Sequence, residues 1–82
     1  MQLNHNLEEV NSAFYNRLLE AYPNLSKTEV EVCALIILNM SNQEIADVRG
    51  TSTNTINVTK SRIRKKLGIT QQQDLFTTLK QV

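Results

Sequence analysis

The sequence predicts an all-α fold, a small helical bundle of about five helices that contains a helix-turn-helix. Apolar residues recur at helical spacing along most of the 82-residue chain. Two Ser-x-x-Glu capping boxes mark consecutive helix starts, and a basic stretch follows the second of them. A chain of this length is expected to form one domain.

Residues 1–22 are predicted to form an N-terminal helix, with Asn6 as its N-cap, Glu9 three residues later and Pro23 at its end. Its apolar series consists of Leu7, Val10, Phe14 and Leu18. Packing against a core is the favoured use of this series, and a short dimer contact is the second.

The next helix is predicted to start at a capping box formed by Ser26 and Glu29. It is apolar on nearly all sides as far as Leu38, so we expect it to be the central core helix. The single cysteine, Cys33, lies in its middle and is interpreted as a packed small hydrophobe rather than a redox sensor.

A short second helix follows at once. Asn39 is a predicted left-handed terminator, and Ser41 with Glu44 repeats the capping box. This helix is expected to end near residue 48 or 49, where Gly50 turns the chain. Two helices joined by a brief glycine-containing turn, the second of them cationic, indicate a helix-turn-helix.

The cationic helix is predicted to run from its N-cap Ser52 to its terminator Gly68. Residues 55–59 are mostly β-branched and alternate polar with apolar side chains, which alone would favour a strand. At about 100° per residue, however, one side of a helix collects three apolar residues, namely Ile56, Ile63 and Leu67. The opposite side collects Asn54, Val58, Ser61 and Lys65.

A last helix is predicted after Gly68. Thr70 with Gln73 offers a third capping pattern. The apolar stripe of this helix consists of Leu75, Phe76, Leu79 and Val82. It either covers the core or pairs with a second copy across a two-fold axis.

The charge distribution is uneven, although the net charge is only +1. Residues 48–73 carry six basic side chains and no acid, while all eight acids lie elsewhere. A basic patch confined to one element is typical of nucleic-acid binding. On charge alone, an ordinary solvated helix face is an equally good interpretation.

Several other classes of protein are disfavoured by composition. One cysteine and one histidine provide neither a disulfide nor the usual ligand set of a metal site. Two glycines provide no phosphate-cradling loop, so we expect no enzyme activity, no catalytic residues and no cofactor. The chain has no apolar run near 18 residues and no signal peptide, which favours a soluble, cytoplasmic protein.

An ordered set of short motifs resembles the LuxR/FixJ/GerE-type DNA-binding domain over residues 25–81, in one gapless register. The motifs are Leu25-Ser26 with Glu29, Ser41-Asn42-Gln43-Glu44-Ile45-Ala46, Ser52, Thr55-Ile56, Ile63 and Lys66-Leu67-Gly68-Ile69. Residues 14–23 further resemble the stretch before this domain in regulators of Bacteroides-like bacteria. We therefore expect residues 1–24 to form a helix and turn that pack on a LuxR-type domain at residues 25–82.

The resemblance implies that the third helix of the domain enters the major groove and that the fourth commonly mediates dimerisation. With the exposed positions added, the predicted DNA-binding set is Gln43, Asn54, Thr55, Asn57, Val58, Ser61, Arg62 and Lys65. The predicted dimer contacts are Leu75, Phe76 and Leu79.

Two departures from the family pattern accompany this resemblance. The family usually has lysine and histidine where this chain has Asn57 and Thr59, so a phosphate contact is lost or moved to Arg62 and Lys65. The family's buried leucine and isoleucine in the turn are replaced by Arg49 and Thr51. Either Val48 takes up that packing or the turn is altered.

The contact chemistry follows from the side chains themselves. Four cations would neutralise phosphates and make binding salt-dependent: Arg62, Arg64, Lys65 and Lys66. Asn54, Asn57 and Ser61 can exchange hydrogen bonds with base edges, asparagine suiting adenine. Val58 can touch a thymine methyl group.

The sequence is therefore interpreted as a sequence-specific DNA-binding domain of a bacterial transcriptional regulator, with residues 53–67 as the recognition helix. Its expected partners are double-stranded DNA and a second copy of the chain, with no membrane and no small-molecule ligand. A sigma-factor region-four domain is the nearest alternative. A helical protein-interaction or dimerisation module is the alternative from another class.

Overall fold

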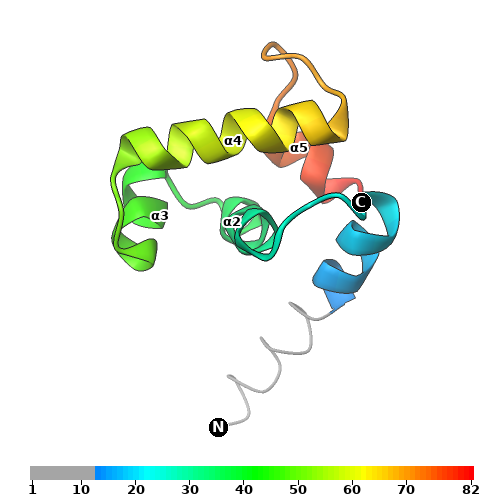
Figure 1. Cartoon of the computed structure of the whole chain (residues 1–82), viewed down its shortest axis with the longest axis horizontal. Helices are drawn as coiled ribbons and strands as arrows, with labels where there is room; N and C mark the ends of the chain where they lie inside the picture. The colour runs from blue at the N-terminus through cyan, green and yellow to red at the C-terminus, as the bar shows by residue number, and fades with distance from the viewer. Residues whose placement is uncertain (1–12) are drawn as a thin grey trace, which may run out of the picture.

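The computed structural model describes residues 13–82, and all regular structure in that part of the chain is helical (Figure 1). A helix at residues 13–21 precedes α2 (Lys27–Ile37), α3 (Asn42–Arg49), α4 (Thr53–Leu67) and α5 (Leu75–Lys80). The predicted all-α bundle of about five helices is confirmed. The expected beginning of the first helix, with Asn6 as N-cap and Leu7 and Val10 in its apolar series, lies outside the described residues.

The core is built around α2, on which α3, α4 and α5 all pack. Figure 1 shows α2 nearly end-on, with α3 and α4 on two sides of it and the helix at residues 13–21 on another. The side chains that meet in the core come from every element, and the largest fully buried ones are Leu18, Val32, Cys33, Ile45, Ile56, Ile63 and Leu79. Burial raises the pKa of the Cys33 thiol to about 12, with a smaller contribution from the charge of Glu29. This cysteine is therefore a protonated thiol that packs in the core as a small apolar side chain.

Both predicted capping boxes are present. The Ser26 hydroxyl accepts a hydrogen bond from the backbone of Glu29 at 3.2 Å, and the Glu29 carboxylate accepts one from the backbone of Ser26 at 2.8 Å. Ser41 and Glu44 repeat the exchange at 3.1 and 2.7 Å. These side chains satisfy backbone donors that the first helical turn leaves free, which fixes where α2 and α3 begin.

Three helices end at residues in the left-handed conformation. Asn39, Gly50 and Gly68 have φ of 63°, 67° and 73° and end α2, α3 and α4, as predicted. In each case the next backbone N–H donates to a carbonyl five residues earlier, at distances of 3.4, 2.9 and 3.1 Å in chain order. α2 is shorter than its apolar run, because Leu38 is already its C-cap and is 56% exposed.

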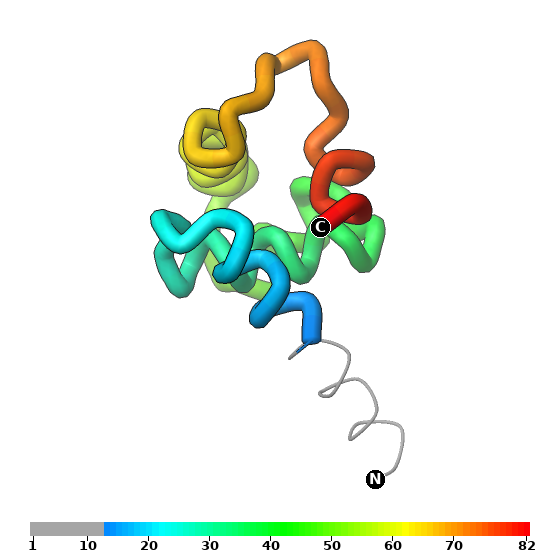
Figure 2. Tube along the Cα trace, turned by 90° about the vertical axis from the view of Figure 1, so that its right-hand side faces the viewer, coloured from blue at the N-terminus to red at the C-terminus, as the bar shows by residue number. Residues whose placement is uncertain are grey.

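The predicted start of the last helix at Thr70 is wrong. The Gln73 side chain does accept from the Thr70 backbone at 2.9 Å, but the Gln73 backbone donates back to the Thr70 carbonyl at 3.2 Å and closes a turn. Asp74 caps α5 instead, with its carboxylate 3.0 Å from the Thr77 backbone nitrogen. Figure 2 shows residues 68–74 as an arch between α4 and α5. The predicted hydrogen bond between Thr70 and Gln73 therefore exists, but it belongs to the turn before α5 and not to the start of the helix.

Candidate nucleic-acid interface

α4 forms one edge of the bundle, with α2 and α3 on its inner side (Figure 1). Its inner face buries Ile56, Ile63 and Leu67, as the helical register predicted. Thr59 is buried with them and donates its hydroxyl to the Thr55 carbonyl at 3.0 Å. The β-branched front half is helical because both Ile56 and Thr59 reach the core from positions three residues apart, a spacing that only a helix brings to one side.

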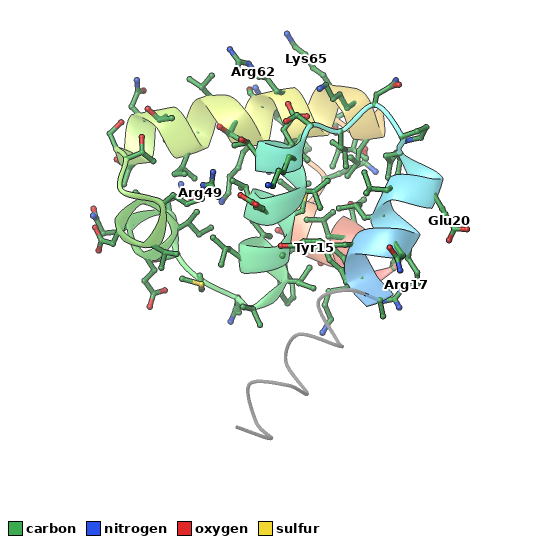
Figure 3. All side chains as sticks on the ribbon, turned by 60° about the horizontal axis from the view of Figure 1, so that its bottom comes forward. Tyr15, Arg17, Glu20, Arg49, Arg62 and Lys65 are labelled. Carbon is green, nitrogen blue, oxygen red and sulfur yellow. The ribbon has the colours of Figure 1, made fainter. Side chains whose placement is uncertain are left out.

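The outer face of α4 carries seven of the eight predicted contact residues. All eight predicted DNA-binding residues are exposed: Gln43, Asn54, Thr55, Asn57, Val58, Ser61, Arg62 and Lys65. Val58 is 44% exposed, so the outer face also presents an apolar group. Figure 3 shows Arg62 and Lys65 projecting from α4 away from the other helices. Gln43 lies on α3 and donates to Asp47 at 2.9 Å.

The basic residues of α4 divide into two groups. Arg62 and Lys65 are exposed, and no ion pair with another described residue engages them. Lys66 instead donates to the Glu29 carboxylate at 2.7 Å and to the Asn24 carbonyl at 3.1 Å. Lys66 therefore joins the end of α4 to the start of α2 and is not a free cation of the outer face. Arg64 is half-buried, and its Nε is buried without a hydrogen-bond partner in the described part of the chain.

Glu29 is a buried carboxylate with two functions in the fold. One oxygen accepts hydrogen bonds from both the Ser26 backbone and the Lys66 ammonium group. Burial raises its pKa, but the hydrogen bonds from Lys66 and Ser26 and the Lys66 charge outweigh burial, so the pKa is lowered from its ordinary value. The carboxylate is thus ionised, capping α2 and anchoring α4 at once.

A chain of side-chain hydrogen bonds crosses the junction between α3 and α4. The Lys60 ammonium donates to Asn42 Oδ1, and Asn42 Nδ2 donates to Asn57 Oδ1 at 2.8 Å. Lys60 is half-buried; burial and the Arg64 charge lower its pKa, while Asp74 raises it. Sequence reasoning assigned no function to Asn42 or Lys60. The available signal was that Lys60 lies three residues after Asn57, on the same side of the helix.

The turn between α3 and α4 contains Arg49 and Thr51, where the resemblance led us to expect buried apolar residues. Val48 is 63% exposed, so it does not take up their packing. Arg49 instead forms an ion pair with Glu31 of α2 at 2.5 Å, and it lies between α3 and α2 in Figure 3. The Thr51 backbone closes the turn on the Ala46 carbonyl at 2.9 Å. A salt bridge thus holds the end of α3 to the core helix.

The residues predicted for dimerisation lie mostly inside the single chain. Leu75 and Leu79 are only 3% and 1% exposed, so α5 covers the core with them, which is the first of its two predicted uses. Phe76 is half-buried, and the Lys80 ammonium lies 5.5 Å from the centre of its ring. Dimerisation through α5 stays a prediction, with Phe76 as the apolar side chain that still presents surface.

Among residues 13–82, no three His, Cys, Asp or Glu side chains are placed to hold a metal ion. No helix in this range has the length and apolar character that a membrane span requires.

Most of the chain, including the helix-turn-helix, matches a known protein family. The family model described as bacterial regulatory proteins, luxR family, matches residues 23–79. Comparisons with curated proteins and with solved structures give no significant match. The matched range contains α2 to α4 and most of α5, including both capping boxes and the outer face of α4. The chain therefore belongs to the luxR family of bacterial regulatory proteins, with its helix-turn-helix DNA-binding domain at residues 23–79.

Proposed function

We propose that the chain binds double-stranded DNA in a sequence-specific manner and thereby regulates transcription, acting in the bacterial cytoplasm with α4 in the major groove. The observation that carries the proposal is the two-sided character of α4. Its inner face is anchored in the core, while its outer face presents amides, hydroxyls and free cations and no acid. Membership of the luxR family supports the same function.

The dimensions and chemistry of α4 suit the major groove. A helix with its side chains is about 10–12 Å wide, and the major groove of B-DNA is about 12 Å wide. Arg62 and Lys65 supply phosphate contacts that carry no sequence information. Asn54, Asn57 and Ser61 supply hydrogen bonds to base edges, and Val58 supplies an apolar contact that suits a thymine methyl group.

The experiment that tests this function is selection from a randomised duplex pool at low and at moderate salt, with sequencing of the bound fraction. We expect a roughly palindromic motif with half-sites about 10 bp apart, because two copies related by a two-fold axis would bind successive turns of the groove. Absence of binding at low salt would contradict the proposal. Salt-sensitive binding without enrichment would contradict its sequence-specific part.

A protein-interaction module is the competing function from another class. The helix at residues 13–21 and α2 border a cleft of about 290 Å³ lined by Tyr15, Leu19, Lys27, Val30 and Glu31. This cleft does not include Arg62 or Lys65, and it is where a partner helix would dock under that model. The model predicts no salt-dependent affinity for DNA, so the selection experiment separates the two functions. A sigma-factor region-four function predicts enrichment of one asymmetric promoter element rather than a palindrome.

A further inference from the structure

The carboxamide of Asn57 is oriented by the residues beneath it. We propose that Asn42 is a positioning residue that makes Asn57 a hydrogen-bond donor toward DNA, so that Asn57 selects guanine rather than adenine at its base position. The inference rests on the proposed function and concerns the chemistry of one contact within it. The observation that carries it is the hydrogen-bond chain from Lys60 through Asn42 to Asn57.

The direction of this chain is set by the charge at its inner end. The Lys60 ammonium has three donors and no acceptor, so the Asn42 atom that faces it must be the carbonyl oxygen. The Asn42 amino group then faces Asn57, and only the Asn57 carbonyl can accept from it. Rotating either carboxamide by 180° would oppose two donors. A lysine therefore determines the orientation of an asparagine at the protein surface.

The elements that hold the chain are fixed by other contacts. Asn42 is the first residue of α3, directly after Ser41, whose capping box with Glu44 locks that helix start. Lys60 is half-buried on α4, three residues after Asn57. All three residues of the hydrogen-bond chain thus lie on regular helices rather than on loops, which limits the movements that would break its hydrogen bonds.

The fixed orientation changes which base Asn57 can read. Pairing with adenine needs Oδ1 to accept from the adenine amino group while Nδ2 donates to N7. Here Oδ1 already accepts from Asn42 at 2.8 Å, and a second amino group would have to approach beside the first. Nδ2 has no acceptor among the described residues, so it is the group left for DNA. Guanine presents two acceptors, N7 and O6, on the same edge.

The test compares base preferences of variants selected from the same randomised duplex pool. Asn57→Ala identifies the base position, because preference there is lost. Asn42→Asp keeps an acceptor for Lys60 but has no N–H for Asn57, and Lys60→Met removes the ammonium group while keeping the side-chain length. We expect guanine at this position for the wild type. In both other variants we expect the guanine-to-adenine ratio to fall roughly tenfold, because Asn57 Oδ1 is no longer held by the Asn42 amino group and can accept from the adenine amino group.

The controls separate this inference from a structural effect. Asn16→Ala, at an exposed asparagine of the helix at residues 13–21, should leave every position unchanged. Because preferences are compared within each pool, a uniform loss of affinity from the added charge of Asn42→Asp does not enter the ratio. In the free protein, ¹⁵N relaxation should show a more ordered side-chain amide for Asn57 than for Asn16, and Asn42→Ala should remove the difference, because it leaves Asn57 without a side-chain partner at residue 42.

The outcomes distinguish a failure of the proposed function from a failure of the positioning role of Asn42. A wild type that enriches no motif overturns the proposed function. A motif whose Asn57-dependent position is adenine, or is unchanged in Asn42→Asp and Lys60→Met, overturns the positioning role while leaving the function intact. An Asn57 amide as mobile as that of Asn16 overturns the positioning role without any DNA measurement.

Discussion

Lys65 and Lys66 show that neighbouring residues of the same type have different functions in this helix. A step of about 100° per residue carries Lys65 to the outer face and Lys66 to the edge that meets α2. Lys65 is exposed, whereas Lys66 is bonded to buried Glu29. The sequence predicted that both were phosphate contacts, because both belong to the same basic helix. A single carboxylate oxygen that serves both a cap and an ion pair is visible only once α2 and α4 are placed together.

Replacing Lys66 by alanine is expected to lower the free energy of unfolding by about 1–3 kcal/mol at neutral pH, because a buried carboxylate loses its counter-ion. The lowered pKa of Glu29 fixes the pH dependence. A group with a folded-state pKa below its unfolded value stabilises the fold at pH above the unfolded value, here 4.5. That contribution is lost as the pH falls through the folded-state pKa.

Urea unfolding of the wild type and Lys66→Ala from pH 7 to pH 3 measures this difference. It should be largest at neutral pH and shrink below pH 4.5, the ordinary pKa of glutamate, as Glu29 becomes protonated. The matched control is Lys65→Ala, which should change stability by no more than about 0.5 kcal/mol. A constant difference across the pH range would contradict the pairing.

Replacing Lys65 by alanine is expected to weaken binding to all DNA sequences alike, because a phosphate contact carries no base information. The slope of log K against log salt should fall by about 1. Equilibrium titrations of one specific and one unrelated duplex at several salt concentrations measure both effects. Asn57→Ala should instead alter preference at one base position with its slope nearly unchanged. Identical behaviour of the two variants would contradict the division between phosphate and base contacts.

At the level of elements, the starts and ends of the helices were predictable where the signals are local. A capping box joins residues three apart, and a left-handed terminator needs only one residue, so α2, α3 and α4 start or stop as expected. α5 was misplaced because Thr70–Gln73 and Asp74–Thr77 both satisfy local rules. The choice between them depends on whether Leu75 and Leu79 reach the core.

The turn between α3 and α4 was only partly predictable, because one of the contacts that hold it joins distant residues. Its stop at Gly50 is a local signal and was predicted. The ion pair between Arg49 and Glu31 joins residues that are 18 positions apart, so no local sequence pattern predicts it. The sequence alone therefore showed Arg49 only as a charged residue where an apolar one was expected, and its partner Glu31 became visible once α2 and α3 were placed together.

Replacing Gly50 by alanine tests how much the left-handed turn contributes. A Cβ at Gly50 would meet no atom within 4 Å, so the cost is confined to the backbone at φ 67°. We expect a loss of about 1–2 kcal/mol for Gly50→Ala and a smaller loss for Gly50→Asn, because asparagine tolerates this conformation. Thermal unfolding followed by circular dichroism measures both. Equal losses for the two variants would show that crowding rather than backbone conformation sets the cost.

At the level of the whole molecule, the helix at residues 13–21 shares its core with the domain that follows. Phe14 and Leu18 are buried in the same cluster as the core residues of α2 to α5. Arg17 donates to the carbonyl of Val82 at 3.3 Å, which joins this helix to the C-terminal end. The family match begins only at residue 23. The predicted boundary between residues 24 and 25 stays a prediction, and the helix that precedes the matched range contributes to the same core.

Replacing Leu18 by alanine should therefore destabilise the DNA-binding domain although the residue lies outside the family match. Leu18 is fully buried, and truncation of such a leucine costs about 2–5 kcal/mol through lost transfer energy and the cavity left behind. For an 82-residue chain of ordinary stability, that loss is a large share of the total. Urea unfolding measures it, and Leu18→Met, which keeps the volume, should recover most of the loss.

The neighbouring Leu19→Ala is the matched control, because Leu19 is 41% exposed and should cost far less. DNA affinity of the folded fraction should be unchanged in both variants, since neither side chain is near the outer face of α4. If Leu18→Ala unfolded at the same urea concentration as Leu19→Ala, the helix at residues 13–21 would be an independent appendage, and residues 25–82 would supply a complete core alone. If it unfolded well below, the folding unit would be longer than the family's domain, and any fragment made for DNA-binding measurements would need to include residues 13–21.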